Sequence, residues 1–370
     1  MKPQRLYLVA GEASGDLHGA NLIRSIKNLH PGAEIRCWGG DLMRDAGAHL
    51  VSHYRERAFM GLWEVIKNIR TIRRFLKQAQ NDILAWKPDV LVLIDNPGFN
   101  LRLAKVAHRA GIPVHYYIAP KVWAWNTGRV KQIKQFTDKV YAILPFEKEF
   151  FSKHGIDVEY VGNPVVDAVH AFQAEHTDLG QKDRVALLPG SRTNEIASAL
   201  PVMAELAKRM PDKDFVVAAA PSFPESYYQQ FRLPENVKLV YNDTYSMLAQ
   251  SRVAVVSSGT ATLETALLGI PQVVCYKVAA LTYAVGKRVI KVPYISLVNL
   301  VLNRKAVPEL IQSDFNPEMV QKELMAIWEG EGREQQLQAY RELAGIMGEA
   351  GASKRVAEML ARTVREREKE

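Results

Sequence analysis

Short, largely apolar runs recur along this chain, separated by segments long enough for a helix. They cover residues 6–10, 34–38, 90–94, 114–118, 140–144 and 158–161 in the first half, and 185–188, 215–219, 237–240, 253–256 and 273–275 in the second. A run without polar alternation is typical of a parallel strand that is buried on both faces. The pattern therefore predicts an α/β protein built from doubly wound, Rossmann-like sheets.

The series of strands starts again after the turn Gly162-Asn163-Pro164, which predicts a domain junction there, although the turn could also have no further role. We expect an N-terminal domain over residues 1–163 and a C-terminal domain over residues 164–340. The length of 370 residues agrees with two domains, because a single core stops growing at about 250 to 300 residues. Beyond about residue 316 the sequence reads as helices.

The chain is basic, with a net charge of +8 and a pI near 9.3. We expect an anionic partner, and nucleic acid, a phosphorylated metabolite or an anionic membrane surface would each satisfy the charge. The apolar runs are too short to span a bilayer and the N-terminus enters a strand directly, so the cytoplasm is the expected location. Cys37 and Cys275 form no paired motif, and we expect both to be buried.

A strand, a turn of small hydroxylated residues and a helix start follow one another in residues 253–264. Unpaired N–H groups at a helix start, hydroxyl groups and the helix dipole together favour a phosphate group. The candidate phosphate-binding residues are Ser258, Gly259, Thr260, Ala261 and Thr262. Glu264, in the first helical turn, could accept hydrogen bonds from ribose hydroxyls or only complement the helix dipole.

The strand at residues 185–188 leads into a second turn of this kind, Gly190-Ser191-Arg192. An arginine at a helix start supplies a permanent, fork-shaped cation that suits two phosphate oxygens. A solvated surface arginine is the alternative for Arg192.

In the first half, the strand at residues 6–10 is followed by Gly11, Glu12, Ala13, Ser14, Gly15 and Asp16. The glycines would let a ligand approach the backbone, and Ser14 or Asp16 could cap a helix that begins near Leu17. A plain capped turn explains the same residues equally well. The glycine spacing is not that of a dinucleotide-binding fingerprint.

Asp95 directly follows the apolar strand at residues 90–94. Ligands of open parallel sheets bind at the carboxyl ends of the strands, and partial burial there would raise the pKa of an acid toward that of a general base. An Asp before a turn often only bonds its own backbone, and this alternative stays open.

A basic amphipathic helix is predicted over residues 61–78. Its apolar stripe is formed by Leu62, Val65, Ile69, Ile72 and Leu76, and its basic face by Lys67, Arg70, Arg74 and Lys77. Further large apolar side chains are Met60, Trp63, Ile66 and Phe75. Basic charge beside extra apolar groups is typical of a helix that lies on an anionic membrane or contacts acyl chains, whereas packing on its own sheet is the alternative.

Several kinds of site are missing from the sequence. It contains no phosphate loop, no His-Glu-x-x-His and no Cys-x-x-Cys pair, and its nine histidines do not cluster. Asp212-Lys213-Asp214 precedes a strand and so should lie at the wrong end of the sheet for a metal–diphosphate site. We therefore expect no metal, no cofactor and no nucleic-acid partner.

Taken together, these runs resemble the bacterial lipid-A-disaccharide synthase family over most of the chain. The runs that carry the resemblance are LVAGEASGD (8–16), FMGLWE (59–64), IDNPGFN (94–100), VWAW (122–125), LPFE (144–147), LLPGSR (187–192), SGTATLE (258–264) and SLVN (296–299). Each run is weak alone, but their order and spacing are specific. This chain departs from the family pattern at Gly98, where members often carry Asp.

The resemblance implies a GT-B type α/β fold, with two doubly wound Rossmann-like domains facing a central cleft. It implies an inverting, metal-independent glycosyltransferase that moves 2,3-diacylglucosamine from UDP to the 6-hydroxyl of 2,3-diacylglucosamine 1-phosphate. The products are the β-1,6 lipid A disaccharide 1-phosphate and UDP. The enzyme would lie in the cytoplasm, at the inner face of the cytoplasmic membrane. The helix within residues 341–370 would pack on the N-terminal domain or on a partner subunit of a possible homodimer.

Matching positions give these residues roles by resemblance. Asp95 becomes the catalytic base, and residues 11–16 become the acceptor side. The donor-binding set is Gly162, Asn163, Gly190, Ser191, Arg192, Glu195, Ser258, Gly259, Thr260, Ala261, Thr262, Glu264 and Asn299. The membrane or acyl-chain contacts become Met60, Trp63, Ile66, Lys67, Arg70, Arg74, Phe75 and Lys77. Without an acid at Gly98, the assignment of the base rests on Asp95.

Two other functions stay open. A UDP-sugar epimerase of similar two-domain form would keep the donor site but would need neither an acceptor base nor an acyl-chain surface. A nucleotide- or lipid-binding protein without activity would bind but release no UDP.

Overall fold

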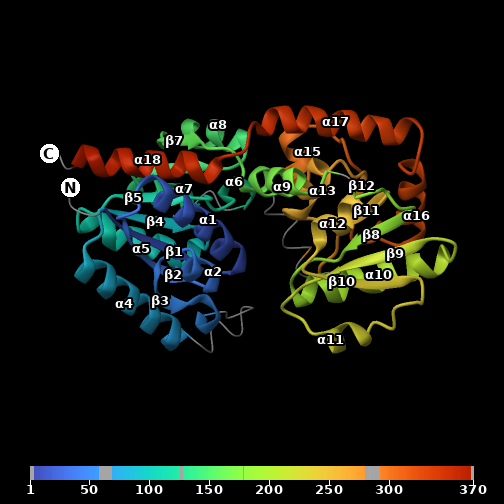
Figure 1. Ribbon diagram of the computed structural model, residues 1–370, viewed down its shortest axis with the longest axis horizontal. Coiled ribbons are helices and arrows are strands. Elements are labelled where there is room, and N and C mark those ends of the chain that lie inside the picture. Colours follow the sequence, from blue (N-terminus) through green and yellow to red (C-terminus); the bar gives the residue numbers. More distant parts are fainter. Residues whose placement is uncertain are drawn as a thin grey trace. The chain divides into compact units, whose positions relative to one another are not determined.

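The computed structural model describes residues 4–57, 69–125, 128–177, 179–279, 283 and 292–367. The chain divides into two compact units (Figure 1). Unit 1 comprises Met1–Pro164 together with Ala350–Glu370, and unit 2 comprises Val165–Glu349. Each unit has a parallel sheet of its own and is described by itself.

Unit 1 contains a seven-stranded sheet. Its strands are β1 (Arg5–Ala10), β2 (Glu34–Gly39), β3 (His49–His53), β4 (Val90–Ile94), β5 (Val114–Tyr117), β6 (Lys139–Ala142) and β7 (Val158–Tyr160). They pair in the order β3-β2-β1-β4-β5-β6-β7, and all the pairs are parallel. The strand order reverses between β1 and β4, so the loops that follow these two strands flank the place where such sheets bind ligands.

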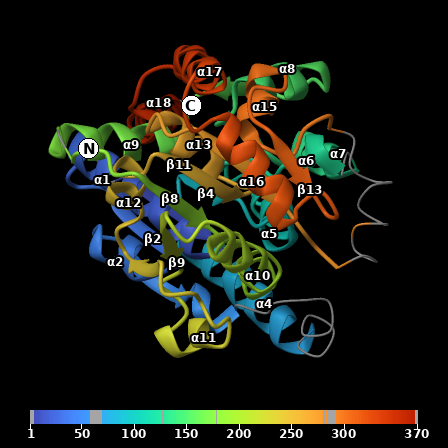
Figure 2. The same cartoon turned by 90° about the vertical axis from the view of Figure 1, so that its right-hand side faces the viewer.

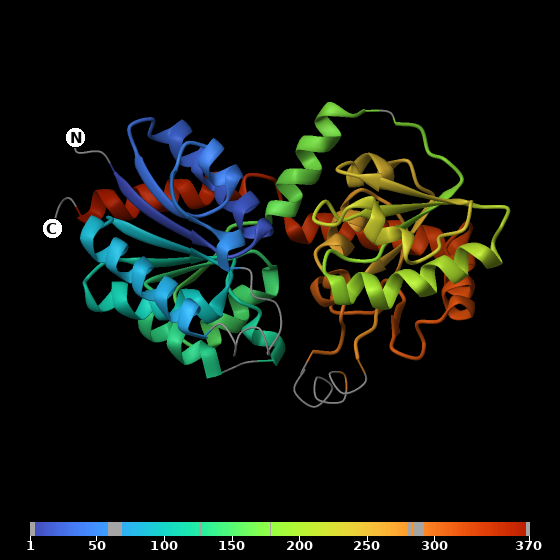
Figure 3. The ribbon, with the colours of Figure 1, turned by 90° about the horizontal axis from the view of Figure 1, so that it is seen from below.

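Helices cover both faces of this sheet. They are α1 (Ala13–Leu29), α2 (Asp41–Asp45), α4 (Ile69–Trp86), α5 (Pro97–Arg109), α6 (Val122–Trp125), α7 (Gly128–Phe136), α8 (Pro145–Lys153) and α18 (Ala352–Arg367), with a 3₁₀ turn at Tyr54–Arg57. Helices α1, α2 and α18 share one apolar cluster with the sheet, and α4, α5, α7 and α8 share the other (Figure 3). The strands are apolar on both sides because both sides are buried.

Unit 2 contains a six-stranded sheet. Its strands are β8 (Arg184–Leu188), β9 (Asp214–Ala219), β10 (Val237–Tyr241), β11 (Val253–Ser257), β12 (Gln272–Tyr276) and β13 (Glu309–Ile311). They pair in parallel in the order β10-β9-β8-β11-β12-β13, which reverses between β8 and β11.

The helices of unit 2 again lie on both faces of its sheet. They are α9 (Pro164–Glu175), α10 (Thr193–Arg209), α11 (Glu225–Gln229), α12 (Thr244–Ala249), α13 (Ala261–Leu267), α15 (Leu297–Leu302), α16 (Pro317–Ala326) and α17 (Glu331–Met347). Helices α10 and α16 contact each other over one face (Figure 2), and α12 and α13 contribute to the apolar cluster on the other.

The α/β fold predicted from the apolar runs is confirmed, and each predicted strand is present within two residues of its expected ends. Two edge strands were missed. Strand β3 carries a histidine at each end, and β13 has three residues, so neither gives a long apolar run. Both cysteines are buried as predicted, and burial raises the pKa of each thiol to about 12.

The expected boundary at residue 340 needs correction, because it falls inside α17. That helix continues to Met347, and glycines with positive φ at Gly348 and Gly351 separate it from α18. Helix α17 therefore belongs to unit 2, whereas α18 packs on α1 and β4 of unit 1. The Arg355 side chain ties α18 to the sheet by donating to the Val161 carbonyl oxygen at 2.7 Å.

Candidate active site

The loops after β1 and β4 meet at the point where the strand order of unit 1 reverses. A Cβ atom at Gly11 would overlap the side-chain amide of Asn96, so only glycine allows this approach. The sequence predicted a glycine for close approach of a ligand, and the structure shows that the first group to approach Gly11 is Asn96.

Asp95 lies at the carboxyl end of β4 in a strained backbone conformation. Asp95 and Asn96 have φ values of 45° and 43°, in the left-handed region that few non-glycine residues adopt. Such strain costs about 1 to 3 kcal/mol per residue and persists only where surrounding contacts impose it. The strain therefore implies that neighbouring groups hold Asp95 in place.

Two buried side chains and one backbone group hold Asp95. Its carbonyl oxygen accepts hydrogen bonds from Asn100 Nδ2 at 2.7 Å and from Tyr116 Oη at 2.6 Å. Its N–H donates to the Ile118 carbonyl oxygen at 3.2 Å, and Ile118 also has a positive φ. Sequence reasoning gave no role to Asn100 or Tyr116, since Asn100 reads as part of a helix start and Tyr116 as a strand residue.

Burial raises the pKa of the Tyr116 hydroxyl well above its usual value, and the negative charge of Asp95 adds to this, while Asn100 and the Arg129 guanidinium act in the opposite direction. Tyr116 therefore keeps its proton at physiological pH and remains a hydrogen-bond donor.

Asp16 has a role that the sequence did not predict. Helix α1 begins at Ala13, so neither Ser14 nor Asp16 is its N-cap, and the expected start near Leu17 is wrong. The buried Asp16 carboxylate instead accepts hydrogen bonds from the backbone N–H groups of Gly40, Leu42 and Met43, at 2.7, 3.2 and 3.1 Å. It therefore caps α2 from another element, and its oxygens are occupied by the protein.

The rest of this loop presents polar groups to solvent. Glu12 and Ser14 are exposed, and Ser14 Oγ donates to Glu12 Oε1 at 3.0 Å. Gly15 is buried, and a Cβ atom there would lie 3.1 Å from the Ala10 Cβ. Of the acceptor-side candidates, Glu12 and Ser14 are thus the ones whose side chains face water.

Gly162 and Asn163 lie after β7 in unit 1, whereas the other donor-site candidates lie in unit 2. Asn163 is buried, and its side chain donates to the Ile143 carbonyl oxygen at 2.9 Å. Gly162 has a φ of 85°, which favours glycine. The structure thus gives these two residues a part in the turn that ends the sheet of unit 1.

The motifs VWAW (122–125) and LPFE (144–147) are joined by hydrogen bonds to the buried Glu147. The Glu147 carboxylate accepts hydrogen bonds from Trp123 Nε1 at 2.9 Å and from the Ile143 and Leu144 N–H groups at 3.1 and 3.0 Å. Burial raises the pKa of Glu147, while these donors lower it. Glu147 therefore joins the loops that follow β5 and β6.

In unit 2, the loop after β8 is shaped by Glu195. Its Oε2 accepts hydrogen bonds from the N–H groups of Ser191 and Arg192 at 3.0 and 3.3 Å. Gly190 has a φ of 104°, and a Cβ atom there would lie 2.5 Å from Glu195 Oε2. Glu195 is therefore a cap that orders the turn, and it needs a glycine at residue 190.

Arg192 lies beside this cap. Its side chain is 59% exposed, and its Nη1 lies 3.4 Å from Glu195 Oε1. An ion pair so exposed holds its partners weakly, so the guanidinium can reorient toward an anion.

The loop after β11 is adjacent, because β8 and β11 are paired. Two of its hydroxyls act inside the protein, since Ser258 Oγ donates to the Ile295 carbonyl oxygen at 2.7 Å and Thr262 Oγ1 to that of Gly259 at 2.8 Å. A Cβ atom at Gly259 would meet nothing within 4 Å. The open part of this loop is therefore Gly259 and the exposed Thr260.

Glu264 lies one turn into α13. Burial raises the pKa of its carboxyl group, while the Tyr245 hydroxyl, which donates to Oε1 at 3.0 Å, lowers it. The bond fixes one carboxylate oxygen and orients the side chain.

Asn299 is completely buried. Its Nδ2 donates to the Val307 carbonyl oxygen at 3.0 Å and to Glu309 Oε1 at 2.8 Å, and its Oδ1 accepts from the N–H groups of Ala306 and Val307 at 2.7 and 2.9 Å. Four internal bonds satisfy the capacity of this amide. The structure thus assigns Asn299 to the ordering of the loop before β13.

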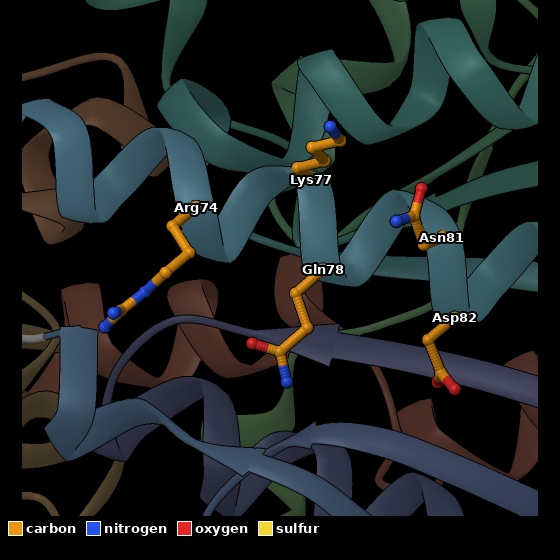
Figure 4. A pocket seen from close by; sticks show the side chains of 5 residues that line it. All are labelled: Arg74, Lys77, Gln78, Asn81 and Asp82. Atoms are coloured by element: carbon orange, nitrogen blue, oxygen red, sulfur yellow. The ribbon is translucent and has the colours of Figure 1, made fainter.

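Of the predicted membrane-contact residues, Met60, Trp63, Ile66 and Lys67 lie outside the described residues. Arg70, Arg74 and Lys77 are exposed on α4, and Lys77 points away from the side of the helix that carries Arg74 (Figure 4). Phe75 is half-buried and its ring packs on the core of unit 1, with its centroid 6.3 Å from that of Trp38, which supports the alternative that this helix packs on its own sheet. An aromatic residue next to the apolar stripe of a helix can still face the core.

Within the described ranges, no three His, Cys, Asp or Glu side chains lie close enough to hold a metal ion. Among the helices of the described residues, none is long and apolar enough to cross a membrane.

Solved structures share the fold of this chain. The UDP-GlcNAc 2-epimerase of Methanocaldococcus jannaschii, in complex with UDP-GlcNAc and UDP, has a TM-score of 0.65 and 13% identity, covering 96% of this chain and 99% of its own. A putative UDP-N-acetylglucosamine 2-epimerase of Listeria monocytogenes has a TM-score of 0.70 and 13% identity, covering 96% and 95%. The glycotransferase of kitacinnamycin has a TM-score of 0.65 and 15% identity, covering 98% of this chain and 100% of its own. The fold is therefore of the GT-B type, which transferases and epimerases share.

Sequence relatives decide the family within that class. A family model described as lipid-A-disaccharide synthetase matches residues 6–363. Lipid-A-disaccharide synthase of Myxococcus xanthus is 40% identical over 369 residues, and that of Syntrophus aciditrophicus 39% over 373, covering 96% and 97% of both chains, respectively. The chain belongs to the lipid-A-disaccharide synthase family, as its motifs predicted, and to lipid A biosynthesis.

Proposed function

We propose that this enzyme transfers 2,3-diacylglucosamine from UDP to the 6-hydroxyl of 2,3-diacylglucosamine 1-phosphate. In one displacement, a carboxylate takes the proton of the acceptor hydroxyl, and the oxygen of that hydroxyl attacks the anomeric carbon. The bond from that carbon to the diphosphate breaks, and UDP leaves with the electron pair. Attack from the opposite side inverts the anomeric carbon and gives the β-1,6 disaccharide 1-phosphate.

Asp95 is the proposed base. The observation that supports it best is the pair of hydrogen bonds that Asn100 and Tyr116 donate to its backbone carbonyl oxygen. A residue that serves only as a turn needs no strained pair of φ values held by two buried side chains. A base must instead be kept at a fixed position relative to the hydroxyl that it deprotonates. Because residue 98 is Gly, no second acid follows Asp95 in this loop.

Unit 2 is the proposed donor-binding unit. Backbone N–H groups of the turn at residues 259–261, the Ser191 hydroxyl and the Arg192 guanidinium would neutralise the departing diphosphate without a metal ion. Glu264, oriented by Tyr245, would accept a hydrogen bond from a ribose hydroxyl. Gly162, Asn163, Gly190, Glu195, Ser258, Thr262 and Asn299 would act by ordering loops.

The substrates carry acyl chains, so we propose that the enzyme works at the inner face of the cytoplasmic membrane. The exposed cations of α4, Arg70, Arg74 and Lys77, support contact with anionic lipid headgroups. A homodimer remains a proposal that sedimentation of the purified protein would test.

Disaccharide and UDP formation from both acylated sugars tests the function. The native enzyme is expected to form both products in equal amounts, and Asp95→Asn to lower kcat by roughly 10²- to 10⁴-fold, which is the usual contribution of a general base. Asp212→Asn is the matched control, since Asp212 is 75% exposed and precedes a strand. If native enzyme forms no disaccharide, the function is wrong, and if Asp95→Asn keeps the full rate, the base is wrong.

One further incubation separates the alternatives, because the epimerases that share this fold act without an acceptor. Turnover of the UDP-sugar alone would indicate an epimerase. Binding of UDP without any turnover would indicate a binding protein.

A further inference from the structure

An open pocket of about 550 Å³ lies along the contact between α5 and α7 in unit 1. The polar side chains that line it are Arg102 and Lys105 from α5, and Arg129, Gln132 and Gln135 from α7. Its lining also includes Pro97 and Gly98, the first two residues of α5. The pocket thus starts two residues after Asp95 in the chain.

The pocket is strongly basic. Helices α5 and α7 carry six cations, Arg102, Lys105, Arg109, Arg129, Lys131 and Lys134, and no Asp or Glu. The whole chain has a net charge of +8, so these two helices account for most of the excess. Three of the six cations line one pocket, which would attract a small anion with several oxygen atoms.

The pocket extends to the neighbourhood of the proposed base. Arg129, which also lines it, carries a positive charge that opposes the rise in the pKa of the Tyr116 hydroxyl, and this hydroxyl donates to the Asp95 carbonyl oxygen at 2.6 Å. Arg102 Nη1 donates to the Gly98 carbonyl oxygen at 2.6 Å, which uses one of the five donors of its guanidinium. A Cβ atom at Gly98 would meet nothing within 4 Å, so the space beside this part of the lining is open.

We propose that Arg102, Lys105 and Arg129 form a subsite for the phosphomonoester group of the acceptor. This inference rests on the proposed function. A phosphomonoester is a dianion with three oxygens, which matches two guanidinium forks and one ammonium group better than a single carboxylate does. The subsite would hold the acceptor by its phosphate while its hydroxyl is presented to Asp95.

The test compares two acceptors, the diacylated sugar with its 1-phosphate and the same sugar without it. Native enzyme is expected to prefer the phosphorylated acceptor in kcat/KM. In the double variant Arg102→Gln, Lys105→Gln this preference should fall by roughly 10- to 100-fold, through a higher KM for the phosphorylated acceptor. The matched control is Lys131→Gln, Lys134→Gln, which removes the same charge from exposed positions outside the pocket and should keep the preference.

Each result has one meaning. Absence of disaccharide with native enzyme refutes the proposed function. Disaccharide formation without a phosphate preference, or with a preference that the pocket variant keeps, overturns the subsite alone. Binding to phosphatidylglycerol vesicles distinguishes the two sources of phosphate. If the pocket variant loses vesicle binding more than the control does and keeps its acceptor preference, the pocket serves lipid headgroups and the proposal is wrong.

Discussion

The hydroxyl of Tyr116 donates a 2.6 Å hydrogen bond to the backbone carbonyl oxygen of Asp95. Tyr116 is a residue of β5 and Asp95 directly follows the neighbouring strand β4, so the sheet itself brings them together. The bond fixes the main chain of the proposed base and does not involve its carboxylate. Tyr116 is thus a positioning residue.

Replacement of Tyr116 by Phe is expected to lower kcat about tenfold, because a displaced base transfers its proton less often. The KM for the UDP-sugar should not change. The free energy of unfolding should fall by about 1 kcal/mol, the usual contribution of one hydrogen bond. Tyr141→Phe is the control, since it removes a buried bond to His115 on the opposite face of the sheet from Tyr116. Equal kcat values for the two variants would argue against a positioning role.

Removal of the Asp16 side chain leaves three backbone N–H groups without an acceptor. We expect Asp16→Ala to lower the free energy of unfolding by about 3 kcal/mol, and Asp16→Asn by less, because the amide keeps one acceptor oxygen. Denaturant titration measures both. Asp45→Ala, at the exposed end of α2, should cost little. A similar cost for Asp16→Ala and Asp45→Ala would show that the cap contributes nothing.

Loss of the Glu195 carboxylate releases the N–H groups of Ser191 and Arg192. The turn that is proposed to bind the diphosphate would then sample other conformations, so KM for the UDP-sugar in Glu195→Ala should rise about tenfold. Glu205→Ala, on the same helix and paired only at the surface with Lys208, is the control. An unchanged KM in Glu195→Ala would show that the Glu195 cap does not contribute to binding of the UDP-sugar.

His115 gives the stability a pH dependence of known sign. Burial, and secondarily the charge of Lys139, lowers its pKa to about 3, whereas an unfolded histidine titrates near 6.5. Below pH 6.5 the unfolded chain binds a proton at this histidine that the native protein does not. The free energy of unfolding therefore falls as the pH is lowered from 6.5 to about 3. Between pH 7.5 and 5 this amounts to about 2 kcal/mol. Between these two pH values, the free energy of unfolding of His115→Gln should fall by about 2 kcal/mol less than that of the native protein. An equal fall in both proteins would contradict the assignment to His115.

The apolar runs of the sequence located the sheets because burial on both faces favours apolar residues along most of each strand. They missed β3 and β13, which lie at sheet edges and are short or partly polar. The motifs likewise identified the loops of the candidate site, since turns at strand ends need glycine and small polar residues. They could not show which way each polar side chain points.

The sequence by itself determined the fold class, the family and the loops in which Asp95 and Arg192 lie. Only the tertiary structure decided what the acids and amides of those loops do. Asp16, Glu195 and Asn299 read like ligand-binding residues, but the side chain of each accepts hydrogen bonds from backbone N–H groups of the protein. The partners of Asp16 and Asn299 lie on other elements or loops, and Tyr116 reaches Asp95 from the next strand. Such contacts depend on strand order, because pairing in a parallel sheet joins residues that are distant in the chain.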